Sequence, residues 1–165
     1  GIISLGQLWV YCGMKEGLEV TFFPFYGAEK RGGIARASVI VSTEEIASPL
    51  VTAPDSAIVM NMDSLPLCEA VLKQGGTMII NSSLVKVDTK RTDARVIKVP
   101  CNDIAVKLGD AKFANMVMLG ALSKATGAVK LDKLEAVLKS FFKADKHKFI
   151  PMNMKAIEEG ARAVG

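Results

Sequence analysis

Short apolar runs alternate along this chain with longer stretches in which apolar residues recur every three to four positions. Positions 20–25 form a continuous apolar run of strand length, whereas 2–16 has helical spacing and is followed by Gly17. The same patterns predict further strands at 36–42, 55–61, 77–81 and 95–99, with 48–51 as a short edge strand. They predict helices at 63–73, 102–108, 112–124, 132–142 and 151–163.

Strands that alternate with helices and are short and continuously apolar predict an α/β fold. We expect a largely parallel sheet covered by helices on both faces. A length of 165 residues predicts a single domain over 1–165. Half of the residues are apolar and the mean hydropathy is +0.29, so we expect part of the surface to face partner subunits.

The charge and the cysteines exclude several classes of protein. A net charge of +4 suits an anionic ligand or an acidic partner, but the basic residues are scattered and no nucleic-acid-binding motif occurs. Cys12, Cys68 and Cys101 are far apart, and the single histidine, His147, lies in a charged linker where a surface role is expected. We therefore expect no metal or iron–sulfur cluster bound by this chain, and free thiols in a reducing cytoplasm.

Membrane attachment and secretion are not expected either. No apolar run reaches the roughly 18 residues of a membrane-spanning helix. The start of the chain lacks the basic segment of a signal peptide.

A glycine-rich charged loop follows the first predicted strand. Positions 26–33 read Tyr-Gly-Ala-Glu-Lys-Arg-Gly-Gly. Glycine is used where φ is positive or where another surface comes close, so charges between glycines suggest contact with a ligand or a partner. The alternative is a plain turn in which Glu29 and Arg31 pair with each other. The residues expected to face a ligand or partner here are Tyr26, Gly27, Glu29, Arg31, Gly32 and Gly33.

Polar residues also follow two later strands. Asn61 ends one strand, and Asn81, Ser82 and Ser83 follow another. Ligands of parallel sheets bind beyond the carboxyl ends of the strands, so these groups are candidate ligand contacts. The alternatives are a helix cap at Asn61 and a local turn at 81–83. Because there is no Ser/His/Asp set, carboxylate pair or phosphate-binding lysine loop, we expect a binding platform with no catalytic residue of its own.

Several runs together resemble the gamma subunit of 2-oxoacid:ferredoxin oxidoreductases. They are Gly-Ile-Ile-Ser-Leu-Gly at 1–6, 25–33, Ser48-Pro49, Asp55, Asn-Ser-Ser at 81–83 and Ala-Asn-Met-Val-Met-Leu-Gly-Ala at 114–121. The resemblance spans the chain, and the most specific part is Tyr-Gly-x-Glu-x-Arg-Gly-Gly. Family members begin with a strand and a Gly-x-Gly-Gly-Gln-Gly loop. Gly1 resembles the last glycine of that loop, so we expect the first strand and the rest of the loop to precede it.

The resemblance implies a Rossmann-like fold and a place in a larger enzyme. That enzyme decarboxylates a 2-oxoacid on thiamine diphosphate, passes electrons through iron–sulfur clusters to ferredoxin and transfers the acyl group to coenzyme A. Thiamine diphosphate, Mg²⁺ and the clusters are implied to lie on partner alpha, beta and ferredoxin-like delta subunits. This chain is implied to cover the active site and to help bind coenzyme A, with Gly1 and Asn81–Ser83 at the site. The 2-oxoacid is not determined by this chain.

Two other functions remain open. A stand-alone dinucleotide-binding reductase would need an acidic residue at the end of the second strand of its fold, where this chain has Phe25 and Tyr26. An assembly subunit without a ligand of its own is the other. Titration with coenzyme A would separate a ligand-binding subunit from a scaffold.

Overall fold

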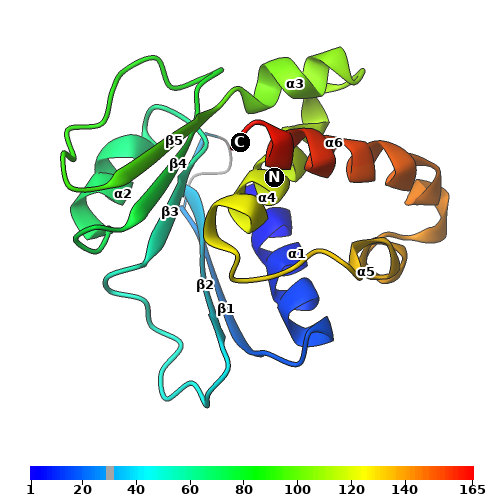
Figure 1. Cartoon of the computed structure of the whole chain (residues 1–165), viewed down its shortest axis with the longest axis horizontal. Helices are drawn as coiled ribbons and strands as arrows, with labels where there is room; N and C mark the ends of the chain where they lie inside the picture. Colours follow the sequence, from blue (N-terminus) through cyan, green and yellow to red (C-terminus); the bar gives the residue numbers. More distant parts are fainter. Residues whose placement is uncertain (29–31) are drawn as a thin grey trace. The chain divides into compact units, whose positions relative to one another are not determined.

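The computed structural model describes residues 1–28 and 32–165, which form two compact units (Figure 1). The hairpin unit comprises 1–51 and 128–150, and the sheet unit comprises 52–127 and 151–165. The expectation of a single domain over 1–165 stays a prediction. Within the described ranges, every helix is too short or too polar to cross a membrane.

The hairpin unit is built on one pair of antiparallel strands. Its elements are α1 (Ile2–Lys15), β1 (Glu19–Tyr26), β2 (Ala35–Ser42), α5 (Leu134–Phe141) and the 3-10 helix η2 (Ala144–Phe149). The pairing runs from Glu19 opposite Ser42 to Tyr26 opposite Ala35. The two predicted strands are confirmed within two residues at each end. They pair antiparallel because the segment 27–34 between them is shorter than the crossover that a parallel pair needs.

Helix α1 packs on one face of this hairpin through two glycines. A Cβ at Gly6 would lie 3.0 Å from the Phe22 ring and 3.1 Å from the Cβ of Ala37. A Cβ at Gly13 would lie 3.1 Å from Val20. The even-numbered side chains of β1 therefore face α1, and the odd-numbered ones point away from it.

The sheet unit holds a parallel sheet with the strand order β3-β4-β5. Its elements are β3 (Ser56–Val59), α2 (Ser64–Val71), β4 (Thr77–Asn81), β5 (Arg95–Val99), α3 (Cys101–Lys107), η1 (Ala111–Phe113), α4 (Ala114–Thr126) and, from its second residue, α6 (Ile150–Arg162). Helices α2 and α4 cover opposite faces of the sheet (Figure 1). Val59 and Ile80 lie in one buried cluster with Leu65 of α2, while Ile79, fully buried, points to the other face.

The predicted α/β class and the helix-covered parallel sheet are confirmed, with local differences. The predicted strands 77–81 and 95–99 match β4 and β5 residue for residue. The predicted edge strand at 48–51 is wrong, because those residues form bends and irregular backbone. The charged linker around His147 contains η2, and the His147 Nε2 lies 3.0 Å and 2.9 Å from the carbonyl oxygens of Lys139 and Phe142. His147 thus caps the end of α5, whose last carbonyls lack helical partners.

Candidate ligand and partner sites

Asn81 holds together the carboxyl edge of the parallel sheet. It is the last residue of β4 and is fully buried. Its Nδ2 donates to the Met60 carbonyl oxygen at 3.3 Å and to the Asn102 Oδ1 at 2.8 Å. Its Oδ1 accepts from the Cys101 backbone N–H at 3.1 Å. Both amide hydrogens and the amide oxygen are therefore engaged inside the protein, so Asn81 positions this edge and offers no free donor to a ligand.

The two serines after Asn81 differ in whether the hydroxyl group is hydrogen-bonded within the protein. The Ser83 Oγ accepts from the Asp103 backbone N–H at 3.0 Å and so caps the first turn of α3. The Ser82 backbone N–H donates to the Val99 carbonyl oxygen at 3.0 Å, while its half-buried hydroxyl has no hydrogen-bond partner among the described residues. Ser82 thus has a hydroxyl available to a ligand at this edge.

Asn61 and Asn102 each take a structural role. The Asn61 Oδ1 accepts from the Ser64 backbone N–H at 3.0 Å, and the Ser64 Oγ donates to the Asn61 carbonyl oxygen at 2.9 Å. Asn61 therefore caps the first residue of α2 from three positions before it, in agreement with the capping interpretation. Asn102 was missed by sequence reasoning. Its only local signal is its place two residues after Pro100, just beyond the end of β5.

The predicted partner-facing loop lies at the end of the β1–β2 hairpin. The Gly27 backbone N–H donates to the Ile34 carbonyl oxygen at 2.7 Å, and Gly32 has a φ of +73°. Positive φ explains the need for glycine at 32. Gly33 follows in the same loop. Glu29, Lys30 and Arg31 lie outside the described residues, so their predicted arrangement stays a prediction. Gly1, also named as a candidate, is the N-cap of α1, where its carbonyl oxygen accepts from the Leu5 N–H at 3.0 Å.

The hairpin end also carries exposed apolar side chains, of which the sequence analysis singled out Tyr26 but not Phe23, Phe25 or Ile34. The exposed fractions are 49% for Phe23, 42% for Phe25, 64% for Tyr26 and 51% for Ile34. The Arg36 guanidinium carbon lies 4.6 Å from the centroid of the Phe25 ring. The apolar run at 20–25 is predicted to be buried when it is taken as one strand of a parallel sheet. The sequence signal for its exposure was Pro24, because proline favours the edge of a sheet.

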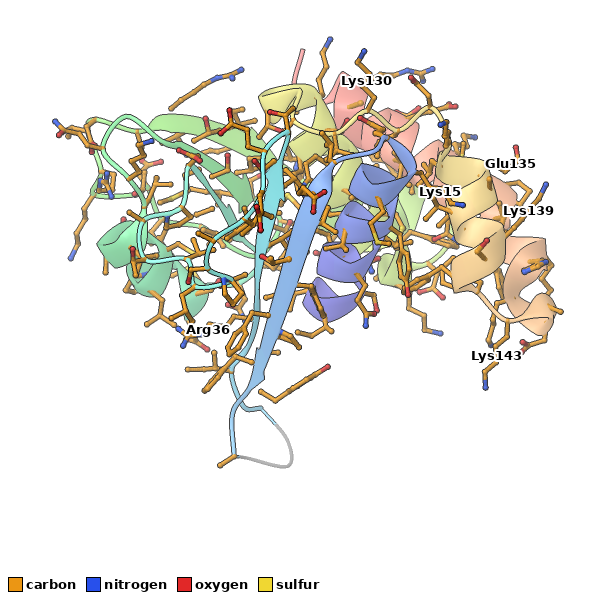
Figure 2. The ribbon with its side chains drawn as sticks, turned by 90° about the horizontal axis from the view of Figure 1, so that it is seen from below. Lys15, Arg36, Lys130, Glu135, Lys139 and Lys143 are labelled. Carbon is orange, nitrogen blue, oxygen red and sulfur yellow. The ribbon has the colours of Figure 1, made fainter. Side chains whose placement is uncertain are left out.

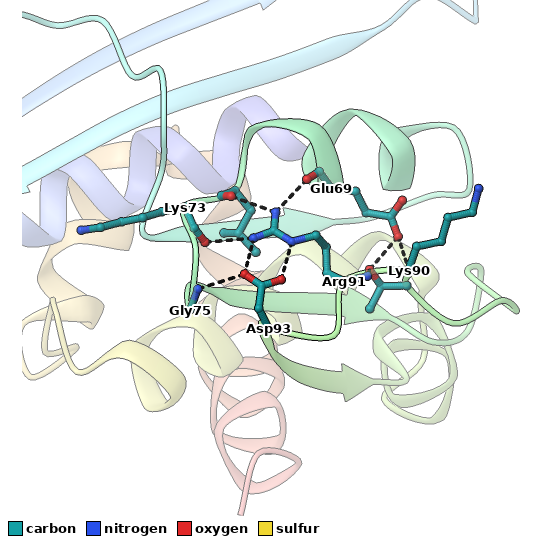
Figure 3. Close-up of polar contacts among 8 residues, drawn as sticks. Glu69, Lys73, Gly75, Lys90, Arg91 and Asp93 are labelled. Atoms are coloured by element: carbon teal, nitrogen blue, oxygen red, sulfur yellow. Dashed lines mark hydrogen bonds and ion pairs between the residues drawn. The ribbon is translucent and has the colours of Figure 1, made fainter.

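A second polar cluster, around Arg91, is structural (Figure 3). The Arg91 Nε donates to the Asp93 carboxylate at 2.7 Å, and its Nη1 donates to the carbonyl oxygens of Glu69 and Leu72, both at 2.8 Å. These bonds tie the segment before β5 to the end of α2. The hydrogen bonds from Arg91 and from the Gly75 N–H hold the pKa of Asp93 well below its usual range. The guanidinium is therefore committed to its own protein and is no anion site.

The cysteines do not form a reactive or metal-binding centre in the described part of the chain. Burial raises the pKa of Cys12 to about 11 and that of Cys101 to about 12. Thiols with a raised pKa are poor nucleophiles and poor metal ligands at neutral pH. Within residues 1–28 and 32–165, no three His, Cys, Asp or Glu side chains gather as a possible metal site.

Comparison with known proteins places this geometry in a family. The family model for pyruvate ferredoxin/flavodoxin oxidoreductase matches residues 1–163. The ketoisovalerate oxidoreductase subunit VorA of Methanothermobacter thermautotrophicus is 34% identical over 98% of this chain, and the match covers 33% of that protein. The chain therefore spans about a third of the length of the first curated relatives that it matches.

Two solved structures have the same fold. The gamma subunit of a keto/oxoacid ferredoxin oxidoreductase from Geobacter sulfurreducens is 25% identical with a TM-score of 0.82, and the match covers 99% of this chain and 91% of that one. The 2-oxoglutarate:ferredoxin oxidoreductase of Magnetococcus marinus, solved with 2-oxoglutarate, coenzyme A and succinyl-CoA, is 23% identical with a TM-score of 0.89. That match covers 99% of this chain and 29% of the other.

Proposed function

Because this chain belongs to the pyruvate ferredoxin/flavodoxin oxidoreductase family, we propose that it is the gamma subunit of a 2-oxoacid:ferredoxin oxidoreductase. In the proposed reaction the 2-oxoacid loses its carboxylate as CO₂, two electrons pass to ferredoxin, and the acyl group joins the sulfur of coenzyme A, whose thiol proton is released. The observation that carries the proposal is the family match over 1–163. The fold of the Geobacter gamma subunit, which this chain covers almost entirely, supports it.

Within that complex the chain acts as a cover and a binding surface. Thiamine diphosphate would supply the electron sink for decarboxylation, and iron–sulfur clusters would carry the electrons. We infer that both groups lie on partner subunits, since among the described residues no three His, Cys, Asp or Glu side chains gather as a possible metal site. This chain's contribution is to exclude water from the active site and to orient coenzyme A.

We place the coenzyme A contact at the carboxyl edge of the parallel sheet. Ser82 offers a hydroxyl there that no described residue engages, and Asn81 fixes the backbone from which Ser82 projects. Ligands of parallel sheets bind at this edge. The Magnetococcus structure holds coenzyme A in a protein that contains this fold, which supports the choice of ligand.

A Ser82→Ala variant in the reconstituted complex tests this assignment. We expect a KM for coenzyme A raised about three- to tenfold, because one hydrogen bond is lost, with the KM for the 2-oxoacid unchanged. Ser140→Ala is the matched control, since the Ser140 hydroxyl donates to the Ala136 carbonyl oxygen within α5. An unchanged KM for coenzyme A in Ser82→Ala would place the ligand elsewhere.

An assembly subunit without its own ligand is the second candidate. The observation that favours it is the internal bonding of Asn81 and of the Ser83 Oγ, which leaves one free hydroxyl where three polar groups were expected. Calorimetric titration of the complex and of the isolated chain with coenzyme A separates the two. Binding that requires this chain supports the first candidate.

A further inference from the structure

The outer half of the β1–β2 hairpin is apolar yet exposed on both of its faces. In β1, the side chains from Phe23 to Tyr26 are all exposed, whereas those from Val20 to Phe22 are half-buried. A strand that packs against a core on one face shows alternating burial. The absence of alternation from Phe23 onward means that the other described residues cover neither face of this hairpin end.

The strand register assigns each exposed side chain to a face. Phe25 stands opposite Arg36, and Phe23 opposite Ser38, so these four lie on the face turned away from α1. Tyr26 stands opposite Ala35, on the same face as Phe22, which packs on Gly6 of α1. The large apolar side chains are therefore divided between the two faces. We call this segment, 23–26 with 34–37, the arm.

The arm continues beyond the support that α1 gives to the hairpin. Gly6 of α1 packs against Phe22 and Ala37 of the hairpin. Fewer than two helical turns of α1 precede Gly6, so little of the helix remains to pack on the hairpin beyond these residues. Figure 2 shows the hairpin running on past the first turn of α1, with Arg36 on the side away from the helix. A two-stranded hairpin without a covered apolar face is only marginally stable in water. We therefore expect another protein surface to bury the aromatic side chains of the arm.

We propose that the arm inserts into an apolar groove of a partner subunit of the oxidoreductase, which contacts both of its faces. This inference rests on the proposed function. Tyrosine and phenylalanine are enriched in the buried centre of protein interfaces. Arg36 is exposed and has no acidic partner among the described residues, and its guanidinium carbon lies 4.6 Å from the centroid of the Phe25 ring. The groove is therefore expected to carry a carboxylate that pairs with Arg36.

Relatives of different lengths favour another part of the oxidoreductase over a second copy of this chain. The fold makes up 91% of the Geobacter gamma subunit but only 33% of VorA and 29% of the Magnetococcus chain. The same fold thus occurs with the rest of a large protein attached and without it. Whether the fold is part of a long protein or a separate subunit, it needs a surface that contacts the rest of the enzyme. It does not in either case need a contact between two copies of itself.

The double variant Phe23→Thr/Phe25→Thr tests the arm in the reconstituted complex. Threonine keeps the strand preference of these positions while removing the rings, so the hairpin is expected to form. We expect assembly with the partner subunits to weaken at least about tenfold, measured by sedimentation or light scattering. Leu67→Gln is the matched control, because Leu67 on α2 is similarly exposed at 44% and lies outside the arm. Circular dichroism melting of the isolated chains checks that both variants fold.

A separate variant tests the claim that both faces are contacted. Tyr26→Thr removes a ring from the face on the α1 side, and it should also weaken assembly. If the double variant weakens assembly and Tyr26→Thr does not, the claim that the partner contacts both faces of the arm is wrong. Unchanged assembly in all arm variants would overturn the proposal, and so would an isolated chain that dimerises through Phe23 and Phe25. If the complex assembles but oxidises no 2-oxoacid, the proposed function fails while the assembly result still decides the arm.

Discussion

The backbone of Gly120 in α4 lies directly against the backbone of Ile157 in α6. A Cβ at position 120 would overlap the carbonyl oxygen of Ile157, and a Cβ at Gly160 would overlap the carbonyl oxygen of Val117. The two glycines thus form a reciprocal pair of contacts. The close approach of the helices requires hydrogen at both positions.

Gly120→Ala is therefore expected to destabilise the protein strongly. The clash is with main-chain atoms, which cannot move away as a flexible side chain could, so we expect a loss of more than about 3 kcal/mol of unfolding free energy. Chemical denaturation measures this loss. Lys124→Ala, an exposed change in the same helix, should stay within about 0.5 kcal/mol. Equal stability of both variants would show that the helices do not meet here.

Asn81→Ala should lower stability because it leaves buried polar groups without partners. The Cys101 N–H loses its acceptor, and the Met60 carbonyl oxygen and the Asn102 Oδ1 lose their donor. We expect a cost of about 1–3 kcal/mol in unfolding free energy. Ser83→Ala, which removes one exposed helix cap, should cost about 1 kcal/mol or less. If Asn81→Ala costs no more than Ser83→Ala, the network at this edge is not stabilising.

The Arg91–Asp93 pair predicts a dependence of stability on acid. The pKa of Asp93 is lower in the folded protein than in the unfolded chain, where it is about 3.9. The contribution of its carboxylate is therefore fully present above about pH 5 and is lost as the pH falls toward the folded pKa. The Tm difference between the wild type and Asp93→Asn should be largest at pH 7 and shrink by about pH 3.

A matched control for that experiment is Asp55→Asn. The Asp55–Lys73 ion pair, at 2.9 Å, is exposed, and exposed pairs contribute little. Its Tm should stay near that of the wild type throughout the titration. A Tm difference for Asp93→Asn that does not change with pH would contradict the assigned role of the carboxylate.

The charged residues 29–31 can be compared directly by mutation. Arginine has a fixed fork of donors suited to phosphate or carboxylate, whereas lysine acts as a flexible point charge. We therefore expect Arg31→Ala to lower the activity of the reconstituted complex at least about tenfold more than Lys30→Ala. Steady-state assays with one 2-oxoacid suffice. Similar activities of the two variants would indicate that this segment is only a turn, without a specific role for Arg31.

The sequence by itself determined the elements whose pattern is local. The strand at 77–81 follows Gly76, the strand at 95–99 is stopped by Pro100, and both are rich in apolar residues. Helix α1 has a regular helical spacing, so each of these elements could be located from its own residues. The cap at Asn61 was one of two open interpretations for the same reason, because its partner Ser64 lies three residues away. The family resemblance followed from the short runs around 26–33 and 114–121.

Only the tertiary structure decided which distant groups meet and which apolar residues stay uncovered. Asn81 and Asn102 are 21 positions apart, and the donors of Arg91 reach carbonyl groups 19 and 22 positions away. The exposure of Tyr26, on the face of the hairpin that meets α1, depends on where α1 stops supporting the hairpin. A local pattern records that a side chain is apolar, but burial depends on the surfaces that the folded chain brings to it.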